Sequence, residues 1–121
     1  MFKEALEAII ENTDGATGAL IMGTDGIAVE KVMRPEADEG NLDVAATEFT
    51  SLVRNAQRAG NDTGLGSVRE LVIMLDNATV IMRLFSREYF VVLSLKPDGN
   101  FGRGRYELRK AELHLAREFS L

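Results

Sequence analysis

The stretch SVRELVIMLDNATVIMRLFSREYFVVLSL, residues 67–95, consists of apolar runs with very little between them. Three runs are strand-like in composition, because they are rich in β-branched and aromatic residues. They cover residues 67–75, 79–86 and 89–95. Asp76-Asn77 and Arg87-Glu88 are long enough only for hairpin turns. The stretch therefore predicts a three-stranded antiparallel meander.

A further hairpin is predicted by GALIMGTDGIAVEKV, residues 18–32. Thr24-Asp25-Gly26 reverses the chain, since an aspartate can bond its own backbone and a glycine accepts a positive φ. The strand before it, residues 17–23, is apolar without interruption over 19–22, as expected for a strand buried on both faces. The strand after it, residues 27–32, carries a glutamate and a lysine, which favours an edge position.

Three segments have the apolar period of amphipathic helices. The first begins near Phe2 and ends at Asn12-Thr13-Asp14-Gly15. The second is capped by Asn41 or Asp43 and runs to Gly60, after the polar loop 34–40. The third covers residues 101–119. Strands 19–22 and 90–93 are apolar on both faces, so helices must cover both faces of the sheet.

The predicted fold is therefore α/β, of the α+β type, with the order α-β-β-α-β-β-β-α. A single five-stranded antiparallel sheet has the middle helix on one face and the terminal helices on the other. A length of 121 residues suits one domain over residues 1–121.

Composition narrows the function classes. The net charge of −5 repels phosphate backbones, so no nucleic-acid partner is expected. No apolar run is long enough to enter a membrane, and no signal peptide is recognisable, so we expect a soluble, cytoplasmic protein without membrane insertion. The absence of cysteine removes disulfides and thiolate chemistry.

The charge is distributed unevenly along the chain. From Arg83 onward there are eight Lys or Arg against five acidic residues, a net charge of +3. Because the whole chain has a net charge of −5, the residues before Arg83 carry −8. Such asymmetry favours self-association or a mixed-charge protein partner; the alternative is a solvated face on the last helix.

Residues with catalytic chemistry are few. There is no Gly-Lys pair of a P-loop, and Gly64-Leu65-Gly66 and Gly102-Arg103-Gly104 are interpreted as turns. His114 is the only histidine and is expected at the surface. The carboxylate pairs Asp14 with Asp25 and Asp38 with Glu39 sit at turns and caps. The methionines 22, 33, 74 and 82 are expected to fill the core. No catalytic residue, cofactor or metal site is predicted, and the protein is not expected to be an enzyme.

The run from Leu71 to Leu75 is apolar on both faces. One strand besides 27–32 must lie at an edge of the sheet. If it is this one, an identical strand related by two-fold symmetry would cover the exposed ladder.

The ordered elements and several motifs resemble the roadblock family, the light-chain-type domain related to dynein roadblock light chains, and its bacterial MglB-like members. The motifs are Gly15-Ala16-Thr17-Gly18-Ala19-Leu20-Ile21 leading into Thr24-Asp25-Gly26, Val44-Ala45-Ala46, Leu65-Gly66 with Glu70, and Asn100-Phe101-Gly102. The resemblance implies a roadblock/profilin-like fold and a dimer formed through the middle helix and the edge of the third strand. It also implies a regulator or scaffold of a small Ras-like GTPase.

Carried over by position, the resemblance assigns two surfaces. The dimer interface comprises Phe49, Leu52, Val53, Leu71, Val72, Ile73, Met74 and Leu75. The GTPase-facing surface comprises Thr47, Ser51, Arg54 and Arg58, and either arginine could stabilise phosphate charge as an arginine finger. MglB-type activators are instead thought to reposition the residues of the GTPase itself.

We therefore expect a homodimeric, non-catalytic regulator or scaffold that binds a small Ras-like GTPase, with GTPase activation among its possible activities. The alternative is a structural light-chain-like adaptor without effect on GTP hydrolysis.

Overall fold

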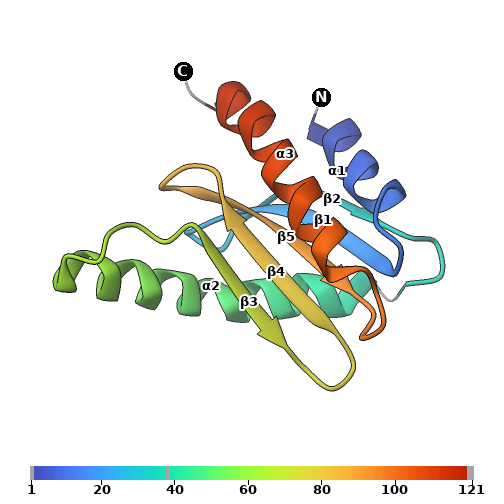
Figure 1. Ribbon diagram of the computed structural model, residues 1–121, viewed down its shortest axis with the longest axis horizontal. Coiled ribbons are helices and arrows are strands. Elements are labelled where there is room, and N and C mark those ends of the chain that lie inside the picture. Colours follow the sequence, from blue (N-terminus) through green and yellow to red (C-terminus); the bar gives the residue numbers. More distant parts are fainter. Residues whose placement is uncertain (1, 38, 120–121) are drawn as a thin grey trace.

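The computed structural model describes residues 2–37 and 39–119 (Figure 1). The elements follow the predicted order α-β-β-α-β-β-β-α. They are α1 (Phe2–Glu11), β1 (Ala16–Gly23), β2 (Ala28–Met33), α2 (Glu39–Thr63), β3 (Glu70–Met74), β4 (Thr79–Leu84), β5 (Tyr89–Leu95) and α3 (Phe101–Phe119).

One five-stranded sheet has the strand order β2-β1-β5-β4-β3, and every neighbouring pair is antiparallel. The two strands predicted to be buried on both faces, β1 and β5, occupy the centre and pair with each other, with Leu20 opposite Val92. The strands β2 and β3 form the two edges. The predicted fold, including the edge position of the third strand, is confirmed.

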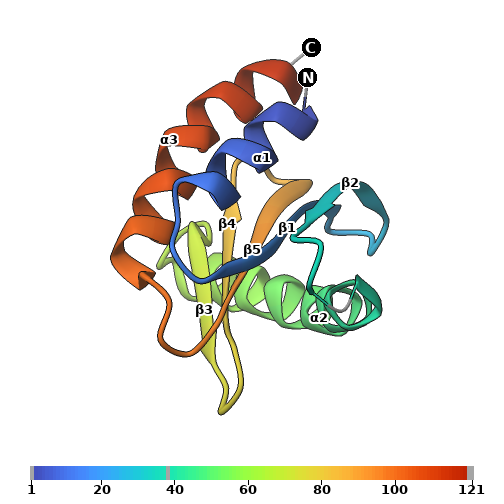
Figure 2. The ribbon, with the colours of Figure 1, turned by 90° about the vertical axis from the view of Figure 1, so that its right-hand side faces the viewer.

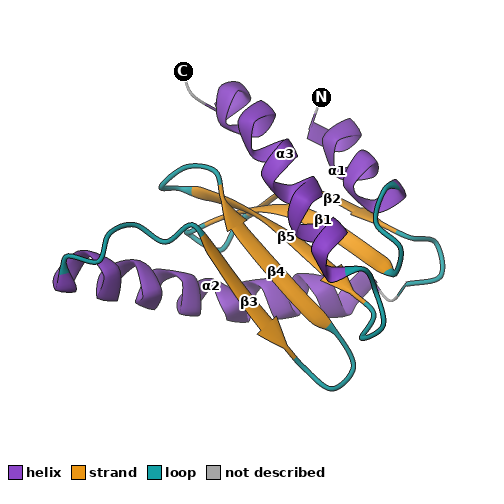
Figure 3. Cartoon of the chain, in the orientation of Figure 1, coloured by secondary structure: helices purple, strands orange, loops and turns teal. Residues whose placement is uncertain are grey.

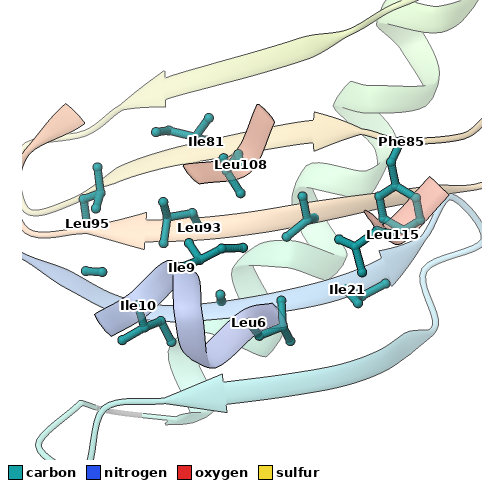
Figure 4. Packing of buried hydrophobic residues seen from close by; sticks show 13 residues of the cluster. Leu6, Ile9, Ile10, Ile21, Ile81, Phe85, Leu93, Leu95, Leu108 and Leu115 are labelled. Atoms are coloured by element: carbon teal, nitrogen blue, oxygen red, sulfur yellow. The ribbon is translucent and has the colours of Figure 1, made fainter. Parts of the chain in front are cut away.

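Helices cover the two faces of the sheet as predicted (Figure 3). Leu6 and Ile9 of α1 and Leu108 and Leu115 of α3 pack on one face, in a first core shown in Figure 4. On the other face, Leu42, Ala46 and Val53 of α2 pack in a second core against side chains of β1, β4 and β5. Successive side chains of the central strands point alternately into the two cores. This explains why the sequence of these strands is apolar without interruption.

The turns use the predicted chemistry. Gly26 has a φ of 88°, and the backbone N–H of Ile27 donates to Asp25 Oδ1 over 3.0 Å. Gly15, at the end of α1, has a φ of 86°. Glycine is favoured at both positions because a side chain is strained at positive φ.

The boundaries of α2 differ from the prediction. The helix begins at Glu39, before both proposed caps, whereas Asp38 lies outside the described residues. It also continues through Gly60 to Thr63. A Cβ on Gly60 would collide with the carbonyl of Gly66, so this glycine permits a close approach of the following loop. Gly64, with a φ of 76°, provides the αL residue that commonly follows a helix.

Two other predictions were wrong. Gly102-Arg103-Gly104 is not a turn but the first turn of α3, and a Cβ on Gly104 would lie 3.0 Å from Leu93 Cδ2, so the glycine lets the helix lie close to the sheet. Met74 does not fill the core, because its side chain is 68% exposed at the sheet edge. The strands β3 and β4 are also shorter than predicted. The strand β3 begins at Glu70, three residues later than predicted, and Leu75 and Ser86 belong to the turns that follow β3 and β4.

Candidate interaction surface

The outer edge of β3 presents apolar side chains. Leu71 and Ile73 point toward the second core, and Val72 and Met74 lie on the opposite face of the strand, with Val72 opposite Ile81 of β4. Val72 is partly exposed, and Leu75, directly after the strand, is 52% exposed. Among the described residues, β4 is the only strand that pairs with β3. The outer edge therefore combines unpaired backbone groups with exposed apolar surface.

The helix α2 passes behind β3 and β4, on the side of the sheet away from α3 (Figure 1). Phe49 packs against the margin of the second core, and together with Leu75 it lines a hollow of about 340 Å³. Leu52 is 44% exposed. Val53 was also assigned to the dimer interface, but it is 0% exposed in the second core, because the period of α2 turns it toward the sheet. Val53 therefore packs beneath this surface and contributes no exposed area to it.

Glu70, at the start of β3, ties the edge strand to α3. Its Oε2 accepts from Arg105 Nε over 2.7 Å, and its Oε1 lies 3.2 Å from Arg83 Nη1. Arg83 Nε also donates to Glu112 Oε1 over 2.7 Å. Burial alone would lower the pKa of Arg83, but Glu112 and Glu70 raise it above the ordinary arginine value. Sequence reasoning missed this network, since its members come from three separate elements.

The four residues assigned to the GTPase-facing surface are exposed and lie along one side of α2. The hydroxyls of Thr47 and Ser51 donate to carbonyls of their own helix, those of Asp43 and Glu48. Such bonds satisfy the two hydroxyl donors within the helix itself.

Both arginines of this surface are engaged within the chain. Arg54 Nη1 donates to the carbonyl of Thr24 in the β1–β2 turn over 2.6 Å. Arg58 Nη1 donates to Asn55 Oδ1 over 3.2 Å. Neither guanidinium uses all its donors in these bonds.

Other candidate chemistry is not brought together. His114 is exposed on α3, 4.0 Å from Glu118, as expected of a surface histidine. Asp25 serves the β1–β2 turn, and the side chain of Glu39 lies outside what the structure describes. Within residues 2–37 and 39–119, no group of His, Cys, Asp and Glu could hold a metal ion, and none of the described helices is long and apolar enough to cross a membrane.

A five-stranded antiparallel sheet with a long helix on one face and the terminal helices on the other defines a profilin-like α+β fold. Accordingly, profilin IB from Acanthamoeba castellanii shares the fold with a TM-score of 0.64 over 98% of both chains, at 15% identity. The family model described as Roadblock/LC7 domain matches residues 2–94, and the chain belongs to this family.

Solved structures agree with this assignment. MglC from Myxococcus xanthus is 34% identical, with 98% of each chain covered and a TM-score of 0.75. The gliding protein MglB from Thermus thermophilus is 21% identical, with 95% of this chain and 85% of that chain covered and a TM-score of 0.83. A search among curated proteins gives no match.

Proposed function

We propose that this protein is a homodimeric, non-catalytic regulator or scaffold that binds a small Ras-like GTPase. The observation that carries the proposal is the open edge of β3, where Val72, Met74 and Leu75 are exposed, together with the exposed Leu52 on α2. An exposed apolar edge strand invites pairing with another strand. An identical edge related by a two-fold axis meets this need with one surface, giving the isologous contact typical of homodimers.

The GTPase-binding part of the proposal rests on family membership and on the likeness to MglB and MglC. The exposed stripe Thr47, Ser51, Arg54 and Arg58 is the proposed contact surface. Because Arg54 and Arg58 each have a bond within the chain, we propose that they contact the GTPase surface and do not enter its nucleotide site.

The dimer is tested by replacing Val72 with lysine. A charge at the open edge opposes strand pairing, so at high salt the V72K variant should elute at the mass of one chain, 13.3 kDa, where the natural protein elutes at twice that mass. Light scattering coupled to size exclusion measures this. Val44→Lys is the matched control, because Val44 is equally apolar and exposed on α2 outside the proposed interface. A V72K protein that is folded by circular dichroism and still dimeric would refute the β3 interface.

The regulatory role is tested with a Ras-like GTPase encoded near this protein's gene. Its rate of GTP hydrolysis is measured with and without this protein, and its co-purification with this protein is tested in parallel. A changed rate that the Arg54→Ala and Ser51→Arg variants alter supports regulation through the α2 stripe. If the GTPase binds this protein but its rate of GTP hydrolysis is unchanged, the structural adaptor is the remaining function. If the GTPase does not bind, the GTPase proposal is refuted.

A further inference from the structure

The outer side of α3 carries a basic stripe that the proposed function does not use. It is formed by Tyr106, Arg109, Lys110, Leu113 and Arg117, whose spacing of three and four residues places them side by side. Leu113 is 73% exposed and Tyr106 is 51% exposed. Lys110 Nζ lies 5.9 Å from the centre of the Tyr106 ring. The stripe is therefore an apolar contact surface set among cations, in a protein whose net charge is −5.

The opposite charge lies on the neighbouring helix. Figure 2 shows α1 beside α3 on the same face of the sheet, with β2 beyond α1. Between α1 and the end of β2 there is an acidic groove of about 440 Å³. Carboxylates line it together with apolar side chains: Glu4, Glu7 and Glu11, with Ile10, Val32 and Pro35.

One cation also lines the acidic groove, but it is turned into the chain. Arg34 Nη2 donates to the carbonyl of Ile10 over 2.7 Å, and Arg34 Nε donates to that of Ala16. Its guanidinium is thus used to hold the end of α1 against the strand. Glu7 and Glu11 remain exposed on α1, so the groove keeps a net negative charge.

We propose that the basic stripe of one copy docks into the acidic groove of a second copy of this chain. Both surfaces combine charge with apolar side chains, and the charges are opposite, which favours this pairing and fixes its orientation. An anionic membrane fits the stripe less well, since the carboxylates of α1 lie on the same face and would be repelled by it. The surface that best matches the basic stripe is therefore the acidic groove of a second copy of the same chain.

This contact is separate from the β3 interface. The acidic groove lies between α1 and the end of β2, and β2 and β3 form opposite edges of the sheet. The basic stripe lies on α3, which covers one face of the sheet, whereas α2 covers the other (Figure 1). Each copy carries both a stripe and a groove, so the contact extends a dimer into larger assemblies. Charge pairs at an exposed surface weaken with salt, whereas apolar pairing at β3 does not. The two contacts therefore respond differently to ionic strength.

The experiment is light scattering of the full chain at low ionic strength and at about 1 M salt, where the Debye length falls to about 3 Å. The expected result is a weight-average mass above that of a dimer at low salt, returning to the dimer at high salt. If the β3 interface does not exist, the high-salt species is a monomer, and the salt-dependent rise above it remains. A mass independent of salt overturns the stripe–groove contact.

Charge reversal identifies the two surfaces. The R109E/K110E and E7K/E11K variants should each lose the low-salt assembly, whereas an equal mixture of the two, or the four changes in one chain, should restore it. Asp62→Lys with Glu88→Lys is the matched control, since it changes the net charge as E7K/E11K does at exposed sites outside both surfaces. Assembly that survives either reversal, or that the control also abolishes, overturns the assignment. The assignment is also overturned if neither the mixture of the two variants nor the chain with all four changes restores the assembly.

Discussion

Replacing Glu70 with glutamine removes the charge that ties β3 to α3. The Glu70 side chain is only 11% exposed and interacts with both Arg83 and Arg105. Its bond to the nearly buried Arg83 is of the charge-assisted kind that contributes about 1.5–3 kcal/mol. The bond to the more exposed Arg105 adds less, about 0.5 kcal/mol, because solvent screens it. Since glutamine retains one acceptor, we expect E70Q to lower the free energy of unfolding by about 2 kcal/mol.

Thermal and urea unfolding measure this effect. A chain of this size loses about 4 °C of Tm per kcal/mol, so the expected decrease is about 8 °C. Glu48→Gln, at an exposed position of α2, is the control and should leave the Tm unchanged. A double-mutant cycle with Arg105→Met should give a coupling energy of about 0.5 kcal/mol between Glu70 and Arg105. If the Tm of E70Q stays within 1–2 °C of the natural protein, roughly the effect of a surface change, the network does not hold the edge strand.

Four other substitutions separate folding from association. Leu115→Ala, at a fully buried position of the first core, should lower the free energy of unfolding by about 2–5 kcal/mol, measured in urea; a loss below 1 kcal/mol would mean a loosely packed core. Gly26→Ala should cost about 1 kcal/mol through the positive φ alone, because an added Cβ meets nothing within 4 Å; an unchanged Tm would contradict this. Leu52→Glu should weaken the dimer in sedimentation without lowering monomer stability, whereas Val53→Ala should lower stability; equal effects of both would refute the division between surface and core.

Element order and layering could be predicted because hydrophobic periodicity reports them directly. The central strands β1 and β5 read as unbroken apolar runs, and only a strand covered on both faces needs such a sequence. The edge strand β2 carries Glu30 and Lys31, which suit an exposed position. These signals are local in sequence, so one sequence was sufficient.

The end of α2 and the place of Gly104 inside α3 depended on contacts that the sequence does not reveal. Gly60 and Gly104 are residues of the type that often ends or interrupts a helix. Each lies inside a helix, at a position where another segment approaches too closely for a side chain. Val53 and Leu52 are neighbours of similar character, and only the rotation of α2 on the sheet makes one buried and the other exposed. The surfaces assigned by resemblance remain predictions, because the residues of one chain do not show what a second chain contacts.

The pairing of β1 with β5 also has a consequence for the order of folding. The β1–β2 hairpin and the β3–β5 meander each form from segments close in sequence, but Ile21 must meet Val91 across the whole of α2. Closing so long a loop lowers the chain entropy before the contacts between the two strands can stabilise the structure. Non-local pairing of this kind slows folding. Two locally formed halves should therefore appear first and join last, and the joint between them is the most deeply buried strand pair of the protein.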